Sequence, residues 1–278
     1  MTQRQRYALL GWPVEHSVSP QMQEAGFAAV GIDAGYEAMP VKPEDVADTV
    51  DRLRRDGYAG WNITVPHKAT MCELADTTST TAQRAASVNT IVNRDGQLHG
   101  YSTDGYGLEM SLREAFALEP AGLRLLFWGA GGAARATSVH FAEAGAAAVT
   151  IVNRTLSRAE ELARVLRQTA PDCDVDALPP YEDELLRAAF SRADVVIQAT
   201  SVGLNPQDPV PIPPDLITPE LCINDMIYGD TPLLQLARER GCRVTDGKAM
   251  LLYQGVRSFS LWTGLDTPPV DAMRRALD

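Results

Sequence analysis

The sequence predicts an α/β fold, in which strands and helices alternate along most of its 278 residues. The first observation is the apolar run Leu125–Trp128, which ends in the glycine-rich segment Gly129–Gly132 and continues as a helix. This pattern is typical of the first strand, turn and helix of a dinucleotide-binding unit. The second observation is that further apolar runs follow at Ala148–Arg154 and Asp194–Thr200, with a helical pattern at Leu156–Arg167 between them.

Each small residue in the glycine-rich turn meets a physical requirement of dinucleotide binding. Gly129 permits a tight turn, Gly131 lets the backbone approach a pyrophosphate, and Ala134 allows close packing of helix on strand. The N-terminus of the following helix points its N–H groups at the phosphates. A glycine-rich turn that binds nothing is the alternative. The predicted cofactor contacts in this turn are Gly129, Ala130, Gly131, Gly132, Ala133 and Ala134.

The end of the second strand indicates which dinucleotide is used. An NAD-binding unit usually carries Asp or Glu there, but this strand ends in Asn153, Arg154 and Thr155, with Arg158 one turn further. Guanidinium groups attract a 2′-phosphate that a carboxylate would repel. We therefore expect NADP rather than NAD. The alternative is that the arginines are solvated surface charges.

Composition limits the partners. With 36 acidic and 25 basic residues the net charge is −11, which argues against nucleic acid or an anionic membrane but not against an anionic small molecule. Neither a metal site nor a disulfide framework is expected, and a reducing cytoplasm fits. The N-terminus lacks the apolar core of a signal peptide, and no apolar run is long enough to span a membrane. The four cysteines are scattered and form no CxxC pair: Cys72, Cys173, Cys222 and Cys242.

The N-terminal part of the chain continues the α/β pattern. Ser19 before Pro20 is predicted to cap a helix, and Asp104 is predicted to cap another at about 108–116. A hairpin is expected at the turn Arg94-Asp95-Gly96. The remaining expected elements are strands at Tyr7–Gly11, Tyr36–Val41 and Gly60–Pro66 and a helix at Pro43–Arg55.

The C-terminal part adds strands at Cys222–Tyr228 and Arg243–Thr245, with a helix at Pro232–Arg240. The stretch Asn205–Pro219 is proline-rich and is expected to form a loop. Lys248–Trp262 is a helix with apolar residues on all sides, which is typical of a helix buried between two bodies.

Eight motifs, in one order and nearly from end to end, resemble those of the shikimate dehydrogenase family. They are Gly11-x-Pro13-x-x-His16-Ser17-x-Ser19-Pro20, Asn62-Ile63-Thr64-x-Pro66-His67-Lys68, Val88-Asn89-Thr90, Thr103-Asp104-x-x-Gly107, the glycine-rich turn with Asn153-Arg154-Thr155-x-x-Arg158, Ala199-Thr200-Ser201-x-Gly203, Asp225-Met226-x-Tyr228, and Gly247-x-x-Met250-Leu251-x-x-Gln254-Gly255.

The resemblance implies two α/β domains. Residues 1–104 would bind substrate, with 247–278 returning to them, and residues 105–246 would form a Rossmann-type NADP domain. The implied reaction is the reversible NADPH-dependent reduction of 3-dehydroshikimate to shikimate in aromatic amino-acid biosynthesis. A homodimer is one candidate for the assembly that this protein forms.

The resemblance also assigns residues. Lys68 and Asp104 would be the catalytic pair, and Ser17 and Ser19 would hold the substrate carboxylate. Thr64, Asn89, Tyr228 and Gln254 would bind the ring or its hydroxyls. The cofactor site would add Thr200, Met226 and Gly247 to the residues already named.

These residue types suit the chemistry. Oxidation of a secondary alcohol needs a hydride acceptor and a group that takes the hydroxyl proton. A carboxylate such as Asp104 would orient the Lys68 ammonium but also hold it charged, which opposes its use as a free base. We therefore expect Lys68 to stabilise the developing alkoxide and to shuttle charge as one unit with Asp104.

The sequence departs from the usual family pattern in four places. Val18 replaces a frequent lysine, Gln23 and Glu24 replace a His-Asn pair, and Ser102 and Gln198 each replace an asparagine. None of these removes a catalytic group, but substrate or cofactor preference could change. The alternatives are a quinate or quinate/shikimate dehydrogenase, a non-catalytic sensor of dinucleotide and ligand, and another enzyme with the same cofactor unit.

Overall fold

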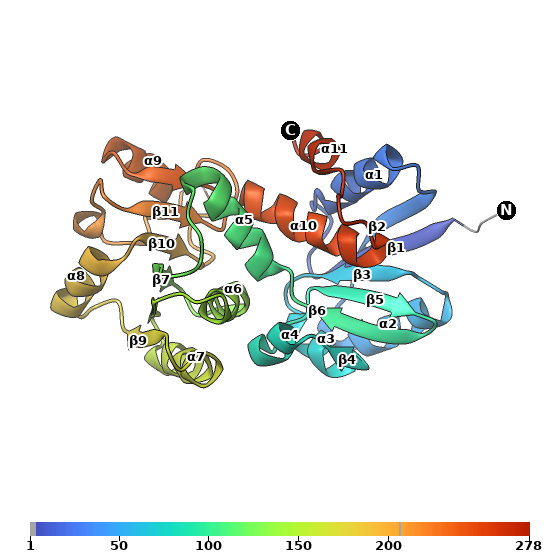
Figure 1. The fold of residues 1–278 in the computed structure, drawn as a ribbon, viewed down its shortest axis with the longest axis horizontal. Coiled ribbons are helices and arrows are strands. Elements are labelled where there is room, and N and C mark those ends of the chain that lie inside the picture. Colours follow the sequence, from blue (N-terminus) through green and yellow to red (C-terminus); the bar gives the residue numbers. More distant parts are fainter. Residues whose placement is uncertain (1–3, 206) are drawn as a thin grey trace. The chain divides into compact units, whose positions relative to one another are not determined.

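The computed structural model describes residues 4–205 and 207–278, and it divides into two compact units (Figure 1). Unit 1 is Met1–Asp104 with Leu252–Asp278, and unit 2 is Gly105–Leu251. Each unit has its own six-stranded sheet, so the α/β prediction is confirmed. Met1, Thr2 and Gln3 of the N-terminus and Pro206 of the proline-rich stretch lie outside the described residues.

The elements of unit 1 begin near the N-terminus and end with the last two helices. They are β1 (Gln5–Gly11), α1 (Ser19–Ala29), β2 (Ala34–Pro40), η1 (Pro43–Asp45), α2 (Val46–Arg55), β3 (Gly60–Ile63), α3 (Lys68–Leu74), β4 (Thr77–Thr78), α4 (Thr80–Ala85), β5 (Thr90–Arg94), β6 (Gln97–Tyr101), most of α10 (Gly247–Thr263) and α11 (Val270–Arg275).

The sheet of unit 1 is mixed, in the order β2-β1-β3-β5-β6-β4. Strand β1 runs parallel to β2 and β3, whereas β5 runs antiparallel to both β3 and β6. The carboxyl ends of β1, β3 and β6 therefore meet the start of β5 at one edge. This edge carries the segments that follow β1, β3 and β6, and it organises the candidate site.

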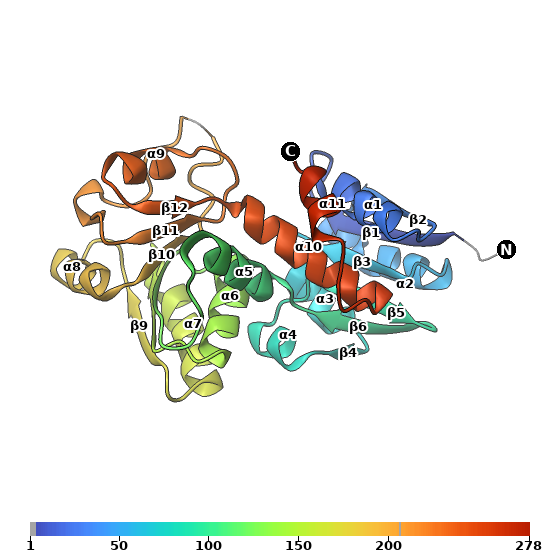
Figure 2. The ribbon, with the colours of Figure 1, turned by 45° about the horizontal axis from the view of Figure 1, so that its top comes forward.

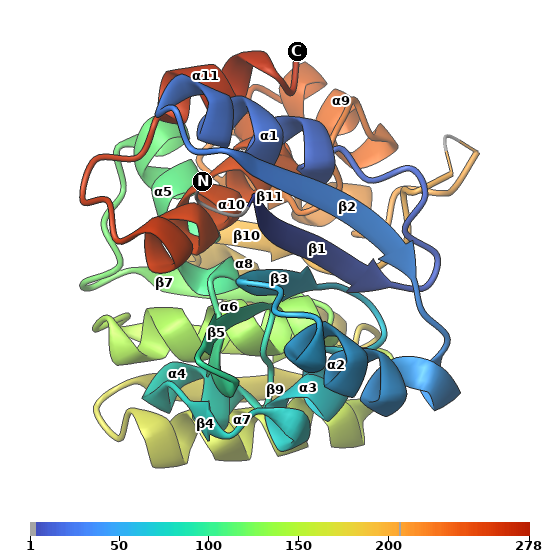
Figure 3. The same ribbon diagram turned by 90° about the vertical axis from the view of Figure 1, so that its right-hand side faces the viewer.

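Alternating side chains build two apolar layers around this sheet. Ala8 and Leu10 face one cluster, which is completed by α2, α3 and α4. Tyr7 and Leu9 face the other, which is completed by α1, α10 and α11. Figure 3 shows α1 and α11 on one side of the strands and α2 and α3 on the other. The C-terminal helices thus bury apolar surface against N-terminal strands, which ties the two ends of the chain into one unit.

The elements of unit 2 alternate regularly. They are α5 (Asp104–Phe116, from Gly105 onward), β7 (Arg124–Trp128), α6 (Gly132–Glu143), β8 (Ala148–Val152), α7 (Leu156–Thr169), β9 (Asp174–Leu178), α8 (Asp183–Arg192), β10 (Val195–Gln198), η2 (Pro214–Leu216), β11 (Cys222–Asp225), α9 (Pro232–Glu239), β12 (Arg243–Thr245) and the first turn of α10.

The sheet of unit 2 is parallel throughout, in the order β12-β11-β10-β7-β8-β9. Read from the other edge, the strands follow the order 3-2-1-4-5-6 of a dinucleotide-binding fold. The chain changes direction across the sheet between β7 and β10, and ligands bind at the carboxyl ends of strands at such a point. Helices α6 and α7 lie on the opposite side of these strands from α8 (Figure 2). The loops after β7, β8, β10 and β11 therefore share one edge.

Several predicted boundaries are wrong by a few residues, for local physical reasons. Ser19 does not cap α1 but is its first residue, and the Ser17 hydroxyl accepts the Ser19 N–H at 3.2 Å instead. Helix α5 begins at Asp104, four residues before the expected start. The strand expected at Gly60–Pro66 ends at Ile63, and that expected at Cys222–Tyr228 ends at Asp225. The Pro43–Arg55 helix starts as the 3₁₀ turn Pro43–Asp45, and its α-helical part begins at Val46.

Candidate active site

Lys68 and Asp104 meet at the sheet edge of unit 1. Lys68 Nζ donates to Asp104 Oδ2 at 2.5 Å, and the side chains are 20% and 6% exposed. Each is the first residue of a helix, of α3 and of α5 respectively. A carboxylate at a helix N-terminus is stabilised by the helix dipole. The pair is thus a charged, largely desolvated donor and acceptor that retains limited access for a ligand.

Asn89 orients the other oxygen of Asp104. Its Nδ2 donates to Asp104 Oδ1 at 2.8 Å and to the Thr103 hydroxyl at 2.9 Å. Its Oδ1 accepts the Thr103 backbone N–H at 2.8 Å, which fixes which end of the amide faces the carboxylate. Asn89, which the resemblance assigned to substrate binding, therefore forms one cluster with the catalytic candidates Lys68 and Asp104.

His67 places Lys68 and was not predicted to matter. Its ring Nε2 lies 2.7 Å from the carbonyl oxygen of Val41, and the residue is 1% exposed. Its backbone N–H donates to Thr64 O, and its carbonyl accepts from Met71 N in α3. The imidazole therefore anchors the start of α3 to the end of β2. The sequence analysis named His67 only as a member of the motif that ends in Lys68.

Ser17, Ser19 and Thr64 follow β1 and β3 at the same edge of the sheet. Ser19 is buried, whereas Ser17 and Thr64 are half-buried. Thr64 N donates to Leu10 O at 2.8 Å, which continues the pairing of β3 with β1. A Cβ on Gly11 would lie 2.3 Å from the Thr64 side chain, so glycine is required where the two strands end.

Gln254 and Tyr228 belong to different units. Gln254 is half-buried on α10 within unit 1, and its carbonyl accepts the Ser258 hydroxyl at 3.0 Å. Tyr228 lies beyond β11 in unit 2 and is 57% exposed. The cluster of unit 1 therefore does not include Tyr228.

The turn after β7 has the shape that a dinucleotide needs. Gly129 has φ +122°, and a Cβ there would lie 2.9 Å from the carbonyl oxygen of Ala199, so only glycine fits without strain. Gly131 and Gly132 are exposed, with no atom closer than 4.0 Å to an added Cβ, and α6 begins at Gly132. Ala134 is fully buried at the third small position. Ala130 and Ala133 are half-buried.

The end of β8 suits a 2′-phosphate. Asn153 Nδ2 donates to Thr155 O at 2.9 Å and so shapes the turn into α7. Arg154 and Arg158 are exposed there, and no acidic residue lies between the end of β8 and Arg158. Arg135 in α6 pairs with Glu161 at 3.0 Å. The donor set and the open glycine backbone together fit NADP at this edge.

Gln198 organises the loop after β10. Its Oε1 accepts Thr200 N at 2.5 Å, and its Nε2 donates to Val202 O at 2.8 Å. A Cβ on Gly129 would also lie 2.9 Å from Thr200 Cγ2, so this loop packs directly on the glycine-rich turn. The sequence showed Gln198 only as a departure from the family pattern. The structure shows that it bonds the loop at both ends.

Two further cofactor candidates, Met226 and Gly247, are neighbours in unit 2. Met226 is half-buried and its N–H donates to Gln198 O at 3.0 Å, while Gly247 N donates to Ile227 O at 3.1 Å. A Cβ on Gly247 would lie 2.2 Å from Met226 O. The close backbone approach explains why glycine occupies this position.

Asp225, at the end of β11, is a buried carboxyl group. It accepts from the Thr231 hydroxyl at 2.7 Å and from Ile227 N at 3.0 Å. Burial raises the pKa of Asp225 above its ordinary value, and these hydrogen bonds oppose the rise. The sequence analysis named Asp225 only as part of a motif.

Among the other departures from the family pattern, Gln23 and Glu24 make hydrogen bonds within unit 1. Gln23 is fully buried and donates to Gly255 O at 3.0 Å. Glu24 accepts Tyr36 N at 3.4 Å. Val18 precedes the first residue of α1, and the half-buried Ser102 precedes Thr103 with its hydroxyl unpartnered.

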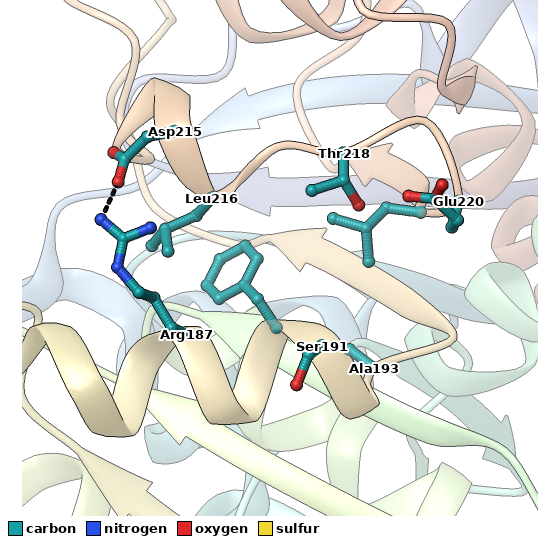
Figure 4. Close-up of a pocket in the computed structure, with 9 residues that line it drawn as sticks. Arg187, Ser191, Ala193, Asp215, Leu216, Thr218 and Glu220 are labelled. Atoms are coloured by element: carbon teal, nitrogen blue, oxygen red, sulfur yellow. Dashed lines mark hydrogen bonds and ion pairs between the residues drawn. The ribbon is translucent and has the colours of Figure 1, made fainter.

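A hollow of about 370 Å³ lies elsewhere in unit 2, between α8 and η2 (Figure 4). Arg187 and Asp215 form an ion pair on one side, and Phe190 and Leu216 line it. It contains none of the predicted site residues.

Within residues 4–205 and 207–278, no group of three His, Cys, Asp or Glu side chains could hold a metal ion. Among the same residues no helix is long and apolar enough to cross a membrane.

Together these features define an oxidoreductase class. Unit 2 has the strand order and glycine-rich turn of a nicotinamide-dinucleotide domain, and unit 1 presents a buried ammonium and carboxylate suited to proton transfer.

Comparisons with known proteins identify the family. Residues 9–91 match the shikimate dehydrogenase substrate binding domain, residues 113–205 match shikimate / quinate 5-dehydrogenase, and residues 249–277 match the shikimate 5′-dehydrogenase C-terminal domain. Shikimate dehydrogenase (NADP(+)) of Moorella thermoacetica is 44% identical over 273 residues, which cover 97% of this chain and 91% of that protein.

Solved structures agree. Shikimate 5-dehydrogenase from Listeria monocytogenes, in complex with shikimate and NAD, has a TM-score of 0.92 and 32% identity, covering 100% of this chain and 98% of that one. The Thermus thermophilus enzyme, in complex with NADP(H) and shikimate, has a TM-score of 0.85 and 34% identity, with 98% of each chain covered. The chain belongs to the shikimate dehydrogenase family, as its motifs indicated, and it is an oxidoreductase.

Proposed function

We propose that this protein catalyses the reversible NADPH-dependent reduction of 3-dehydroshikimate to shikimate. Unit 1 is the substrate domain and unit 2 the NADP domain in this proposal. The observation that carries it is the Lys68–Asp104 contact of 2.5 Å, with Asn89 on the second carboxylate oxygen. A non-catalytic sensor has less need of the Lys68–Asp104 pair, and the chain retains both residues.

NADPH, when bound, supplies the hydride that reduces the substrate carbonyl carbon. The Lys68 ammonium donates a hydrogen bond and then a proton to the carbonyl oxygen as negative charge develops there. Asp104 orients the ammonium, and Asn89 holds Asp104. In the oxidation direction the proton returns from the shikimate hydroxyl to Lys68. The low exposure of the pair strengthens these interactions because little water competes for them.

The remaining candidates of unit 1 bind the substrate. Ser17 and Ser19 hold its carboxylate, since both hydroxyls follow β1 at the edge that also carries Lys68. Thr64, Gln254 and Asn89 bind ring hydroxyls in this proposal. Tyr228 of unit 2 completes the substrate contacts in this proposal.

NADP is held by unit 2. The backbone of Gly129 to Ala134 and the N-terminus of α6 bind the pyrophosphate. Asn153, Arg154, Thr155 and Arg158 bind the 2′-phosphate and ribose, and the arginine side chains supply the opposite charge. Thr200, Met226 and Gly247 contact the nicotinamide part.

The cellular setting follows from the reaction. We propose that the enzyme works in chorismate and aromatic amino-acid biosynthesis in the cytoplasm, as a homodimer. The four cysteines are free thiols, which supports a reducing compartment.

Cofactor reduction, followed by absorbance, tests the function. Purified protein receives shikimate or quinate, each with NADP or NAD. We expect turnover of shikimate with NADP to exceed the other three combinations. If quinate, or shikimate with NAD, were turned over as fast as shikimate with NADP, the result would favour a quinate/shikimate dehydrogenase instead. No turnover, but a higher unfolding temperature with each ligand, would favour a sensor.

A further inference from the structure

A single buried hydroxyl of α10, that of Ser258, contacts strands β3 and β5 of unit 1. It lies 2.7 Å from the Thr90 hydroxyl and accepts from Asn62 Nδ2 at 3.0 Å. Ser258 and Thr90 are fully buried, and Asn62 is 5% exposed. Hydroxyl groups buried in this way are rigidly held, because an unmade hydrogen bond has no water to replace it.

Two of these groups are oriented by a neighbouring phenol. Tyr36 donates to Asn62 Oδ1 at 2.8 Å, which turns Asn62 Nδ2 toward Ser258. Burial raises the pKa of Tyr36 well above its ordinary value, so its phenol keeps its proton. Thr90 is placed to donate to Asn89 Oδ1 at 3.1 Å and Ser258 to Gln254 O at 3.0 Å, so the 2.7 Å contact between the Thr90 and Ser258 hydroxyls shares one of these two protons.

This chain of bonds ends at the candidate catalytic pair. The Asn89 Oδ1 that accepts from Thr90 belongs to the amide whose Nδ2 donates to Asp104 Oδ1 at 2.8 Å. The other oxygen of Asp104 accepts from Lys68. Ser258 touches neither Asp104 nor Lys68, yet its hydroxyl contacts the Thr90 hydroxyl that lies against the Asn89 amide.

We propose that Ser258 is a positioning residue, which fixes the Asn89 amide through Thr90 and thereby orients Asp104 and Lys68. Ser258 also lies 3.0 Å from Gln254 O, so the same side chain holds the turn of α10 that carries a substrate-binding candidate. The inference rests on the proposed function, because it gives Lys68 and Asp104 their catalytic role.

Substitution of the hydroxyls tests the proposal. Ser258→Ala and Thr90→Val each remove a link, and both are expected to lower kcat for shikimate oxidation by about five- to tenfold while the KM for NADP changes by less than about twofold. Thr90→Ser keeps the hydroxyl and is expected to restore most of kcat. Thr263→Val is the matched control, since Thr263 bonds Phe259 O of the same helix at 2.8 Å but is outside the chain of bonds.

A double-variant cycle separates positioning from general stability. In an Asn89→Ala background the link to Asp104 is already absent, so Ser258→Ala is expected to change kcat by less than about twofold. A full five- to tenfold further loss in that background would overturn the proposal, as would wild-type kcat in both single variants.

Hydrogen exchange of the Thr103 amide gives a readout that needs no turnover. This N–H donates to Asn89 Oδ1, so it should exchange faster in Ser258→Ala but not in Thr263→Val. Unchanged exchange would refute the positioning role even in an inactive enzyme. Activity that persists in Lys68→Ala would instead refute the proposed catalytic pair, so the two failures are distinguishable.

Discussion

At the scale of single residues, charge and burial decide what each side chain can do. Lys68 and Asp104 are in direct contact, so the carboxylate holds the lysine Nζ in place for the proton transfer of the proposed reaction. Sequence motifs identified both residues, but not the hydrogen bonds through Asn89, Thr90 and Ser258, because these groups come from separate parts of the chain.

Asp225 predicts a pH dependence of stability. Its pKa is raised in the folded state, so the folded protein binds its proton more tightly than the unfolded chain does. Above the pKa that Asp225 has in the folded protein, its ionised carboxylate destabilises the fold. This destabilisation decreases as the pH falls and is absent below the pKa that Asp225 has in the unfolded chain. The unfolding temperature of Asp225→Asn minus that of wild type, measured by calorimetry, should therefore become smaller as the pH is lowered from 7 to about 4. A constant difference would contradict this.

At the scale of elements, the edge of the unit 2 sheet depends on backbone conformation. Gly129→Ala would place a Cβ 2.9 Å from Ala199 O at φ +122°. We expect a loss of stability of about 1–3 kcal/mol and a higher KM for NADP. Gly132→Ala is the stability control, because its Cβ would meet nothing within 4 Å. Equal unfolding temperatures for the two variants would refute the argument.

The turn from β8 to α7 predicts cofactor preference. Arg158→Ala should raise the KM for NADP by about 10- to 100-fold and leave that for NAD nearly unchanged, since only NADP carries a 2′-phosphate. Arg164→Ala, further along α7 and also exposed, removes the same charge and serves as the control. An equal effect of Arg158→Ala on both cofactors would show that it contacts a shared part of the dinucleotide.

Most elements could be predicted because their hydrophobic patterns are local. The hairpin around Asp95 and Gly96 formed as expected, with both residues at positive φ. The start of α5 could not be predicted, since an aspartate at this position can either cap or begin a helix. Ser19 was misassigned because Ser17, two residues earlier, supplies the hydroxyl.

At the scale of the whole molecule, the proposed contacts to NADP lie in unit 2 and most of the proposed contacts to shikimate lie in unit 1. Shikimate should therefore raise the unfolding temperature of Arg158→Ala as much as that of wild type, and NADP should do the same for Asn89→Ala. Thermal unfolding with each ligand alone measures this. Loss of both ligand responses in either variant would indicate a folding defect rather than a local one.

The division into two α/β units was predictable from the order of the motifs. Which residues, distant in the sequence, belong to the same unit was not predictable. Tyr228 and Lys68 were assigned to one substrate, and the structure describes them in different units. His67 and Gln198 act through backbone carbonyls and amides, which leave no periodic or compositional signal in a single sequence.

The most direct test of the account is the kcat for shikimate oxidation by NADP in Lys68→Ala beside wild type. If Lys68 transfers the proton, kcat should fall by at least about 100-fold while NADP binding, measured by thermal shift, stays intact. A variant that retains kcat within about threefold of wild type would contradict the role of the Lys68–Asp104 pair.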